Sequence, residues 1–529
     1  NGTPIFESIA ATANGKPSPN NTPFRTSDFA FFIQDDWKFR PNLTLNLGLR
    51  WEYFSPITAT DGVLGNLTLG PNNGLAGATI STNKTLTDKD LSNFGPQLGF
   101  AWSPRMFNDK LVIRGGAGIG YDRLPNALLA QARRNPPNGA KYELCCGISG
   151  IAPDDWSTPF VGGLITYVAS SDNTIFGYPA NPLLGGGANA RTGLPNSGQV
   201  EIYGAPRDLP SAYVYRYSLE GQYELPAKMV ATVGYQGSAG RHFVRIVPLH
   251  ILAPSANPNI RAAYFASPDT NSNYNALITN LRRRFSNGLQ FSINYRFSKS
   301  IDNSSYEASC DCTNQSYPID QKEERGPSDF DVTHFFTADG LWELPLFLHD
   351  KTLRGKLLGG WQINPIVTWR GGFPWTPRTF SGLRGPSGFF GDIRPTMFFG
   401  SQPLSNTNSN FLQPGGIFPG GGALYFSTTT NGESPLLNPP GIGRNVFRGP
   451  RYFSTDISFV KRTGLPSMRF FGENAVVDVR FNFFNIFNNL NLAPFRARSD
   501  STRVSSDKFG LATDALAGRT GEFQIRFSF

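Results

Sequence analysis

The sequence predicts an all-β protein whose antiparallel strands form the wall of a transmembrane barrel. The first observation is a recurring alternation of apolar and polar residues, as in GEFQIRFSF at residues 521–529. A period of two marks a strand with one apolar face and one polar face. The second is the length of these stretches, roughly 11 residues, which matches the ~9–11 that a tilted strand needs to cross a bilayer. The third is a strict alternation of short and long connections along the chain.

The composition agrees with many strands and long loops. The 529 residues include 57 Gly, 41 Pro and 44 Phe, and aromatic residues make up 13%. No run of about 18 apolar residues occurs, so the sequence predicts no transmembrane helix. A mean hydropathy of −0.28 does not oppose a barrel, because alternating strands cross a bilayer without a high mean hydropathy. The net charge of +9 comes from singly spaced arginines apart from 282–284, so we do not expect nucleic-acid binding.

About thirteen strands follow in order, most of them joined in pairs by short turns. In the first pair, Leu45 and Leu47 face one way and Arg50 faces the other. The predicted strands are 28–39, 43–53, 93–104, 110–122, 211–224, 228–237, 273–286, 288–300, 330–343, 360–371, 452–462, 475–487 and 521–529.

Long stretches rich in Gly, Pro and Asn separate the pairs. They cover 55–92, 123–210, 238–272, 301–328, 372–450 and 488–520. Outer-membrane barrels have short periplasmic turns and long external loops. If the last strand ends in the periplasm, every short turn of this chain is periplasmic and every long stretch is an external loop. The sequence therefore predicts a barrel in the outer membrane of a Gram-negative bacterium, with a periplasmic C-terminus. The alternative from the same pattern is a soluble all-β binding module with an apolar core.

Motifs for an enzyme, a metal site or a cofactor are not found in the sequence. The four histidines form no HExxH or Cys/His cluster, and no G-x-S-x-G occurs. RGGAGIGYD at 114–122 misses the G-x-G-x-x-G spacing of a phosphate loop and lies in a strand pattern. We expect its glycines to relieve crowding on the inner wall.

Two groups of residues are candidates for contact with a solute. Inward-facing arginines could favour anions, although such charges more often hydrate a lumen or form ion pairs; they are Arg50, Arg216, Arg296, Arg370, Arg480 and Arg526. Aromatic residues of the loops could contact a ligand, although packing of the loops on themselves is the commoner use; they are Trp156, Tyr178, Phe380, Phe389, Phe390 and Tyr425.

The four cysteines all lie in predicted external loops. They are Cys145, Cys146, Cys310 and Cys312. Disulfides persist in such an oxidising environment, and bridges between loops are favoured over a strained Cys145–Cys146 bond. Four cysteines allow three connectivities, which the sequence does not separate, and free loop thiols remain the alternative.

The chain resembles the C-terminal barrel portion of TonB-dependent receptors, of the Oar-like acidobacterial type that carries an N-terminal carboxypeptidase-regulatory-like domain. The stretches that carry this resemblance are FFIQDDWKFRPNLTLNLGLRWEY (31–53), LVIRGGAGIGYD (111–122), LRRRFSNGLQFSINYRFSKSIDN (281–303), RGPSDFDVTHFF (325–336), LLGGWQINPI (357–366), NPPGIGRNVFRGPRYFSTDISFVK (438–461) and VVDVRFNFFNIFN (476–488).

This resemblance implies an outer-membrane receptor that takes up a ligand with energy from the inner membrane. Implied partners are outer-membrane lipid and lipopolysaccharide, TonB through an absent N-terminal portion, an unidentified ligand, and the barrel assembly machinery, to which Phe527 and Phe529 are presented. The family barrel has roughly 22 strands. We therefore expect 27–529 to be a partial barrel, 1–26 to be an irregular remnant of an external loop, and both edges of the wall to lack neighbours. A passive porin-like channel or a structural or adhesive outer-membrane protein is the alternative function.

Overall fold

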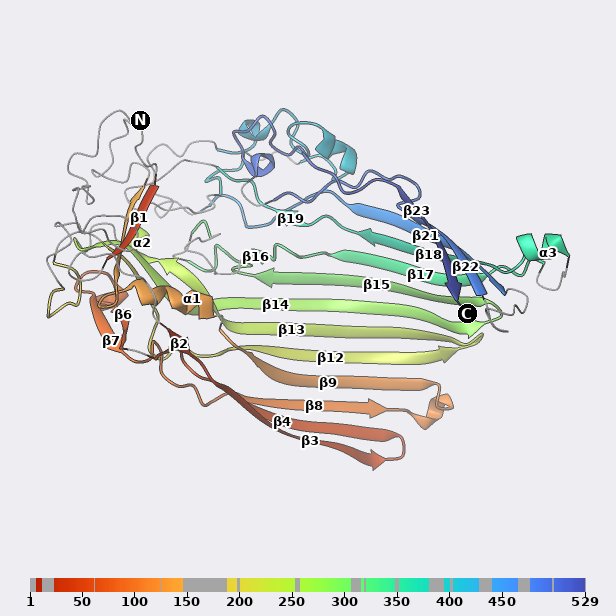
Figure 1. The fold of residues 1–529 in the computed structure, drawn as a ribbon, viewed down its shortest axis with the longest axis horizontal. Coiled ribbons are helices and arrows are strands. Elements are labelled where there is room, and N and C mark those ends of the chain that lie inside the picture. The colour runs from red at the N-terminus through yellow and green to blue at the C-terminus, as the bar shows by residue number, and fades with distance from the viewer. Residues whose placement is uncertain are drawn as a thin grey trace.

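The computed structural model is dominated by one curved antiparallel sheet (Figure 1). The structure describes residues 6–11, 23–60, 62–124, 126–145, 188–196, 200–252, 257–305, 315–317, 320–347, 352–379, 394–399, 403–427, 440–464, 476–496 and 499–528. Within these residues the sheet has 17 strands, four of which (β1, β10, β11 and β16) lie toward the end where the long connections gather. The other thirteen form a wall in which each strand pairs with the next along the chain.

These wall strands are β3 (Asp28–Arg40), β4 (Leu43–Phe54), β8 (Phe94–Trp102), β9 (Leu111–Asp122), β12 (Ala212–Leu225), β13 (Met229–Pro248), β14 (Ile260–Ser286), β15 (Leu289–Asp302), β17 (His334–Glu343), β18 (Trp361–Arg370), β21 (Tyr452–Gly464), β22 (Val476–Phe484) and β23 (Thr520–Ser528). The predicted fold class is confirmed, and each predicted strand has its counterpart. The C-terminus lies at the end of the wall where the short turns are (Figure 1).

Small elements occur in most of the long connections. Helices are α1 (Asn126–Ala130), α2 (Leu249–Leu252) and α3 (Leu353–Leu358), with 3-10 turns η1 (Pro71–Asn73), η2 (Arg105–Phe107), η3 (Gln131–Arg134), η5 (Asn408–Leu412), η6 (Gly422–Leu424) and η7 (Asp500–Thr502). Of these, η2 and α3 lie instead at the turn end of the wall (Figure 1). Short strands are β1 (Phe6–Ala11), β2 (Phe24–Arg25), β5 (Thr58–Ala59), β6 (Leu64–Thr68), β7 (Thr79–Asn83), β10 (Ala140–Cys145), β11 (Val200–Gly204), β16 (Gly326–Pro327), β19 (Pro374–Trp375) and β20 (Phe447–Arg448). Among the described residues, no helix is long and apolar enough to cross a membrane.

Two expectations about irregular stretches are wrong in part. Residues 1–26 were expected to be irregular, yet 6–11 form β1, which pairs with β10, and 24–25 form β2, which pairs with β5. The stretch 238–272 was expected to be a loop, yet β13 and β14 continue through most of it as one hairpin. A bulge at His242, whose φ is +58°, breaks the alternation in the sequence without ending the pairing.

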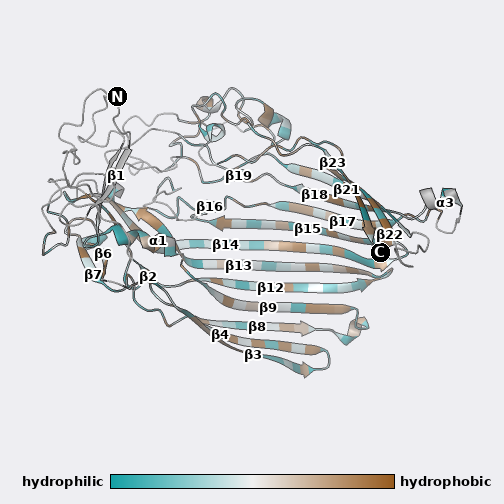
Figure 2. Ribbon diagram, in the orientation of Figure 1, coloured by the Kyte–Doolittle hydropathy of each residue, from teal (hydrophilic) through white to brown (hydrophobic). Residues whose placement is uncertain are grey.

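The strand registers align polar residues on one face of the wall and apolar residues on the other. Along β4, Leu45, Leu47 and Leu49 share the face that carries Phe100, Leu98 and Pro96 on β8. Gly48 is opposite Gln97 on the other face. The resulting bands of hydrophilic and hydrophobic residues are visible along the strands in Figure 2. A single register slip would exchange these faces, so the apolar pattern fixes the pairing.

The buried apolar core lies among the loops rather than inside the wall. Two clusters join the connections after β4 and β9 to the extended hairpin of β13 and β14, and contain Val200, Ile202 and Tyr203 of β11. A third cluster joins the connections after β18 and β22 around Trp375, Phe418 and others. The loops are therefore packed structures with cores of their own.

Both edges of the wall are unpaired on one side. All thirteen residues of β3 are exposed, and β23 is exposed along nearly its whole length. Within the described residues β3 has a ladder with β4 and β23 has one with β22, and no ladder joins β3 to β23. The sheet is an open trough, with β3 along one edge and β23 along the other (Figure 1).

Candidate functional site

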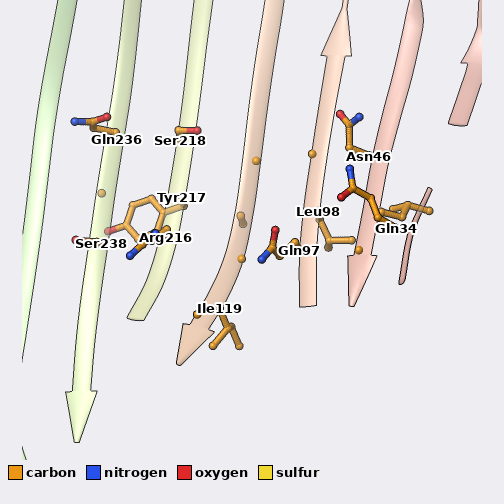
Figure 3. A pocket seen from close by; sticks show the side chains of 18 of the residues that line it. Gln34, Asn46, Gln97, Leu98, Ile119, Arg216, Tyr217, Ser218, Gln236 and Ser238 are labelled. Carbon is orange, nitrogen blue, oxygen red and sulfur yellow. The ribbon is translucent and has the colours of Figure 1, made fainter. Parts of the chain in front are cut away.

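The polar face of the wall carries a continuous row of residues that crosses seven strands. The ladders place the members of this row directly opposite one another; in order across the sheet they are Gln34, Gly48, Gln97, Gly118, Arg216, Ser238 and Tyr274. Amide, hydroxyl and guanidinium groups therefore lie side by side over neighbouring strands, as Figure 3 shows. Such a surface is suited to water and to polar solutes.

A hollow of about 640 Å³ lies against this row. Its polar side chains include Gln34, Asn46, Gln97, Ser218 and Gln236. Part of its floor is bare backbone, contributed by Gly48, Gly99, Gly116, Gly118 and Gly120. The volume falls in the range of ligand pockets, about 300–1,000 Å³.

The glycines on this floor differ in how much space a Cβ atom would have at each position. A Cβ at Gly120 would have no heavy atom within 4 Å, and one at Gly48 would have only ordinary contacts from 3.6 Å. Within RGGAGIGYD, the expected relief of crowding on the inner wall applies to Gly116 and Gly118, where a Cβ would have a neighbour at 3.1 Å, and does not apply to Gly120. Crowding does apply to Gly115 on the apolar face, where a Cβ would lie 2.5 Å from the Phe100 ring. At Gly48 and Gly120 the missing side chains leave the hollow deeper.

Arg216 gives the hollow its charge. Of the described residues that line the hollow, it is the only one with a cationic or carboxylate side chain. The other polar groups are amides and hydroxyls, which both donate and accept hydrogen bonds. The arrangement can bind a polar solute and favours one that presents an anionic or carbonyl oxygen to Arg216.

The other predicted arginines lie on the same face as Arg216, and only Arg216 lines the hollow. Arg50 forms an ion pair with Glu52 at 2.9 Å. The guanidinium of Arg296 lies over Phe335, and that of Arg370 lies over Phe373 at 4.3 Å. Contact of Arg480 or Arg526 with a ligand stays a prediction.

The opposite face of the wall exposes large apolar side chains. Leu98, Leu219, Val233 and Leu277 are each more than 40% exposed, although they lie in mid-strand. Rings at the loop ends of the strands stack on this face, as Phe31 does on Trp51 at 6.0 Å. An exposed apolar surface of this extent, bordered by aromatic rings, is the lipid-facing surface of a membrane protein.

Of the loop aromatic residues and cysteines predicted as candidates, Tyr425 and Cys145 lie within the described residues. Tyr425 packs edge-on against Phe418 at 5.1 Å as part of the third cluster, so its ring serves the folding of the loop. Cys145 ends β10, where it lies opposite Phe6. The remaining loop aromatics and cysteines, together with Phe529, lie outside the described residues; they are Trp156, Tyr178, Phe380, Phe389, Phe390, Cys146, Cys310 and Cys312. Phe527 lies on the apolar face of β23.

A buried ion-pair network, which the sequence reasoning missed, joins the connection after β15 to the connection after β18. Arg444 pairs with Asp302 and donates from Nε to the Glu324 carbonyl oxygen at 2.9 Å. Arg394 donates from Nη2 to Glu324 Oε1 at 2.8 Å, with both side chains at most 2% exposed. Burial lowers the pKa of Arg394, and the charge of Glu324 opposes that shift.

This network explains two of the stretches on which the family resemblance rests. RGPSDFDVT at 325–333 supplies Asp329 and Asp331, which bind Asn445 and Arg448 of GRNVFRGP at 443–450. Asn445 Nδ2 donates to Asp329 Oδ1 at 2.5 Å, and Arg448 Nη2 donates to Asp331 Oδ2 at 2.5 Å. The signal in the sequence was a pair of polar motifs, one across the boundary between the predicted loop 301–328 and the predicted strand 330–343, and the other in the predicted loop 372–450. Among the described residues no group of His, Cys, Asp or Glu is placed to hold a metal ion.

An antiparallel meander with one polar face, one lipid-facing apolar face and packed loops at one end defines the wall of a transmembrane β-barrel. The chain belongs to the family described as outer membrane beta barrel domain, whose model matches residues 6–526. It is therefore an outer-membrane protein. No curated protein matches the chain.

Several solved structures are similar to the chain. A mutant of the ferric enterobactin receptor of Pseudomonas aeruginosa is 11% identical with a TM-score of 0.45; the alignment covers 98% of this chain and 50% of that one. The FrpB iron transporter of Neisseria meningitidis is 11% identical with a TM-score of 0.44, covering 98% and 51%. The outer membrane transporter YddB of Escherichia coli is 9% identical with a TM-score of 0.45, covering 94% and 54%. The chain thus spans about half the length of these proteins, and 37% of the FpvAI chain in its complex with pyocin S2.

Proposed function

We propose that this chain is the barrel wall of an outer-membrane receptor that takes up a scarce ligand in the manner of TonB-dependent receptors of the Oar-like type. The observation that carries the proposal is the hollow at Arg216 on the polar face, which lies below a layer of loops with buried cores. Packed loops are suited to selecting a ligand before it reaches the lumen, because they hold their side chains in fixed positions.

In this proposal the ligand meets the loops first and then the polar row. The loops lie outside the cell, the short turns and the C-terminus lie in the periplasm, and residues 27–529 form the wall. Energy comes from TonB through a portion of the protein N-terminal to this wall. The barrel assembly machinery recognises the last strand, with Phe527 and Phe529 as its terminal aromatic residues.

The test is uptake in the bacterium that makes the protein, with the full-length gene deleted or restored. The probes are a ferric siderophore, an oligosaccharide and a short peptide, each labelled and measured in the periplasmic fraction with and without a protonophore. We expect one class of probe to accumulate only in the restored strain and only without the protonophore. Accumulation of all three probes regardless of the protonophore would instead identify a passive porin-like channel.

A second measurement tests the membrane assignment on which the proposal rests. The protein should be recovered from the outer-membrane fraction only after detergent is added. Recovery in aqueous buffer as a folded protein would remove the proposal and favour a soluble β-rich binding module.

A further inference from the structure

The floor of the hollow follows β9 along the strand. The residues of β9 that face the lumen there are Gly116, Gly118 and Gly120, so three successive inward positions carry no side chain. With a rise of about 3.3 Å per residue, this bare stretch is about 13 Å long. The strands on its two sides, β8 and β12, are about 10 Å apart and carry Gln97 and Arg216 opposite Gly118 (Figure 3). The hollow is therefore a groove along β9, comparable in length with a short oligosaccharide.

Most polar side chains of this groove are not bonded to the protein. Those that form no hydrogen bond or ion pair within the described residues include Gln34, Gln97, Arg216, Ser218, Gln236 and Tyr274. Nearer the turns, polar side chains of the same face are bonded to one another. Arg114 Nη1 donates to Gln222 Oε1 at 3.2 Å, and Asn280 Nδ2 donates to Asn294 Oδ1 at 2.7 Å. The hydrogen-bonding groups of the groove are therefore available to a solute.

Arg216 supplies the positive charge of the groove. No described residue forms an ion pair with its guanidinium. By contrast, Arg50 forms an ion pair with Glu52 on the same face of the wall. A guanidinium binds a carboxylate through two parallel hydrogen bonds, so a carboxylate is the group of a ligand that matches Arg216 best.

The other groups of the groove match hydroxyls better than they match a peptide. The amides of Gln34, Gln97 and Gln236 both donate and accept hydrogen bonds, as sugar hydroxyls do. A peptide needs unpaired backbone groups or apolar pockets for its side chains. The backbone of β9 is paired with β8 on one side and with β12 on the other. Apolar residues next to the hollow, such as Leu98 and Ile119, face the lipid side of the wall.

Tyr274 adds an aromatic ring on the polar face. It lies opposite Ser238 in the row that contains Arg216, two strands away from that arginine. Within the described residues no other ring stacks on it, and its hydroxyl has no hydrogen-bond partner. The negative face of such a ring attracts the C–H groups on the apolar side of a sugar ring.

We propose that this groove binds an acidic oligosaccharide. A carboxylate on one of its sugar residues binds Arg216, and hydroxyls of the neighbouring residues bind the amides of Gln97 and Gln236. A neutral oligosaccharide would leave the charge of Arg216 without a partner, and an acidic peptide would leave the amides without hydroxyls. The inference rests on the proposed function, since it names the class of ligand that the receptor takes up.

The test measures binding to the full-length protein, purified in detergent, by isothermal titration calorimetry. The probes are trigalacturonate, the same trimer with its carboxylates methyl-esterified, and the acidic peptide triglutamate. We expect trigalacturonate to bind about tenfold or more tightly than either of the other probes, because it alone presents both carboxylates and hydroxyls. Tenfold is the size expected for one charge-assisted hydrogen bond.

Three variants show whether the binding takes place in the groove. Arg216→Gln should weaken the binding of trigalacturonate about tenfold and leave that of the esterified trimer unchanged, because only the charge is lost. Gln97→Met keeps the length of the side chain without its amide and should weaken both trimers severalfold. The matched control Arg462→Gln changes an inward-facing cation at the turn end of β21, outside the groove, and should leave every affinity unchanged.

Other results of the titrations would overturn the proposal. Absence of trigalacturonate binding at millimolar concentration would do so, as would equal affinities for the charged and the esterified trimer. Triglutamate that binds as tightly as trigalacturonate would identify a site for acidic chains of any kind. An unchanged affinity in Arg216→Gln, with its heat-resistant β-structure intact, would exclude the groove. Failure of the proposed function gives a different result, in which trigalacturonate binds as expected to the purified protein but does not accumulate in the periplasm.

Discussion

Leu47 and Gly48 are adjacent in the chain and lie on opposite faces of the wall. Leu47 is opposite Leu98 on the apolar face, and Gly48 is opposite Gln97 on the polar one. The same alternation places Arg50 in the lumen. At the scale of the residue, therefore, the alternation along each strand decides whether a side chain faces the lumen or the lipid.

Labelling of single cysteines tests this assignment. Cysteine at Arg50 should react with a membrane-impermeant maleimide, because it faces the aqueous lumen. Cysteine at Leu47 should be protected, because it faces lipid. Labelling of Leu47→Cys together with protection of Arg50→Cys would show that the two faces have been exchanged.

Gly120 allows the role of the hollow to be tested without a clash. Because a Cβ there would contact nothing within 4 Å, Gly120→Leu should fold, and we expect it to lower the uptake rate of the transported probe severalfold by filling the hollow. Gly221→Leu is the matched control, since its Cβ also has no neighbour within 4 Å but its side chain points to lipid. Uptake that falls equally in both variants would mean that the effect comes from the strand and not from the hollow.

The connections behave as structural elements with their own ion pairs. Arg444 and Asp302 are 142 positions apart and both nearly fully buried. Removing one partner leaves the other charge buried and uncompensated, which costs about 3–5 kcal/mol. We expect Arg444→Met to make the connections after β15 and β18 sensitive to protease while the wall keeps its heat-resistant β circular dichroism.

Arg462→Met is the matched control for this prediction. Arg462 is 3.7 Å from Asp478, but its side chain is 73% exposed. An exposed pair contributes about 0–1 kcal/mol, so this variant should resist protease as the wild type does. Equal sensitivity of the two variants would show that the buried network does not hold the loops.

Acid should loosen the extended hairpin of β13 and β14. Asp269 accepts two hydrogen bonds from Arg245, at 2.6 and 2.8 Å. Burial raises the pKa of Asp269, but the hydrogen bonds and charge of Arg245 outweigh it and hold the pKa below its ordinary value of 3.8. The pair therefore stabilises the hairpin above pH 3.8 and loses its effect as the pH falls through the lower pKa of the folded state.

Asp269→Asn should remove this component of the acid sensitivity. At neutral pH we expect the variant to be less stable by about 1 kcal/mol, because solvent screens a partly exposed pair. Hydrogen exchange of the hairpin amides at pH 7 and pH 3 measures both effects. A wild-type hairpin as protected at pH 3 as at pH 7 would show that the pair contributes nothing.

The elements could be predicted from the sequence where the bilayer alone determines the pattern. Every wall strand has a polar and an apolar face, so a period of two located all of them. The strand β11 was missed because all five of its residues are buried, Glu201 included, so it lacks the polar face that marks the wall strands. The hollow was missed because it depends on which glycines align across neighbouring strands. The Arg444 network was missed because its partners are distant in sequence.

At the scale of the whole molecule, the two edges of the wall carry unpaired backbone groups into the membrane. Unpaired N–H and C=O groups are costly in lipid, so each edge requires a neighbouring strand. β3 also carries Asp35 on its lipid-facing side, opposite Leu47, where a carboxylate needs a donor from such a neighbour. The edges lie on opposite sides of the trough, so β3 and β23 do not supply that pairing to each other (Figure 1).

We therefore expect β3 and β23 to pair with strands other than these thirteen. In the full-length protein in its membrane, cysteines replacing Ile33 on β3 and Ile525 on β23 should not form a disulfide under mild oxidation. Cysteines replacing Leu47 and Leu98, which are directly opposite on β4 and β8, should form one readily and serve as the positive control.

Pairing of β3 with β23 could take more than one register. Cysteines at Phe31 and Ile33 should therefore each be combined with cysteines at Phe523, Ile525 and Phe527. Efficient bridging in any of these combinations would show that the thirteen strands close on themselves, in which case the polar face would enclose a narrower lumen with no place for further strands.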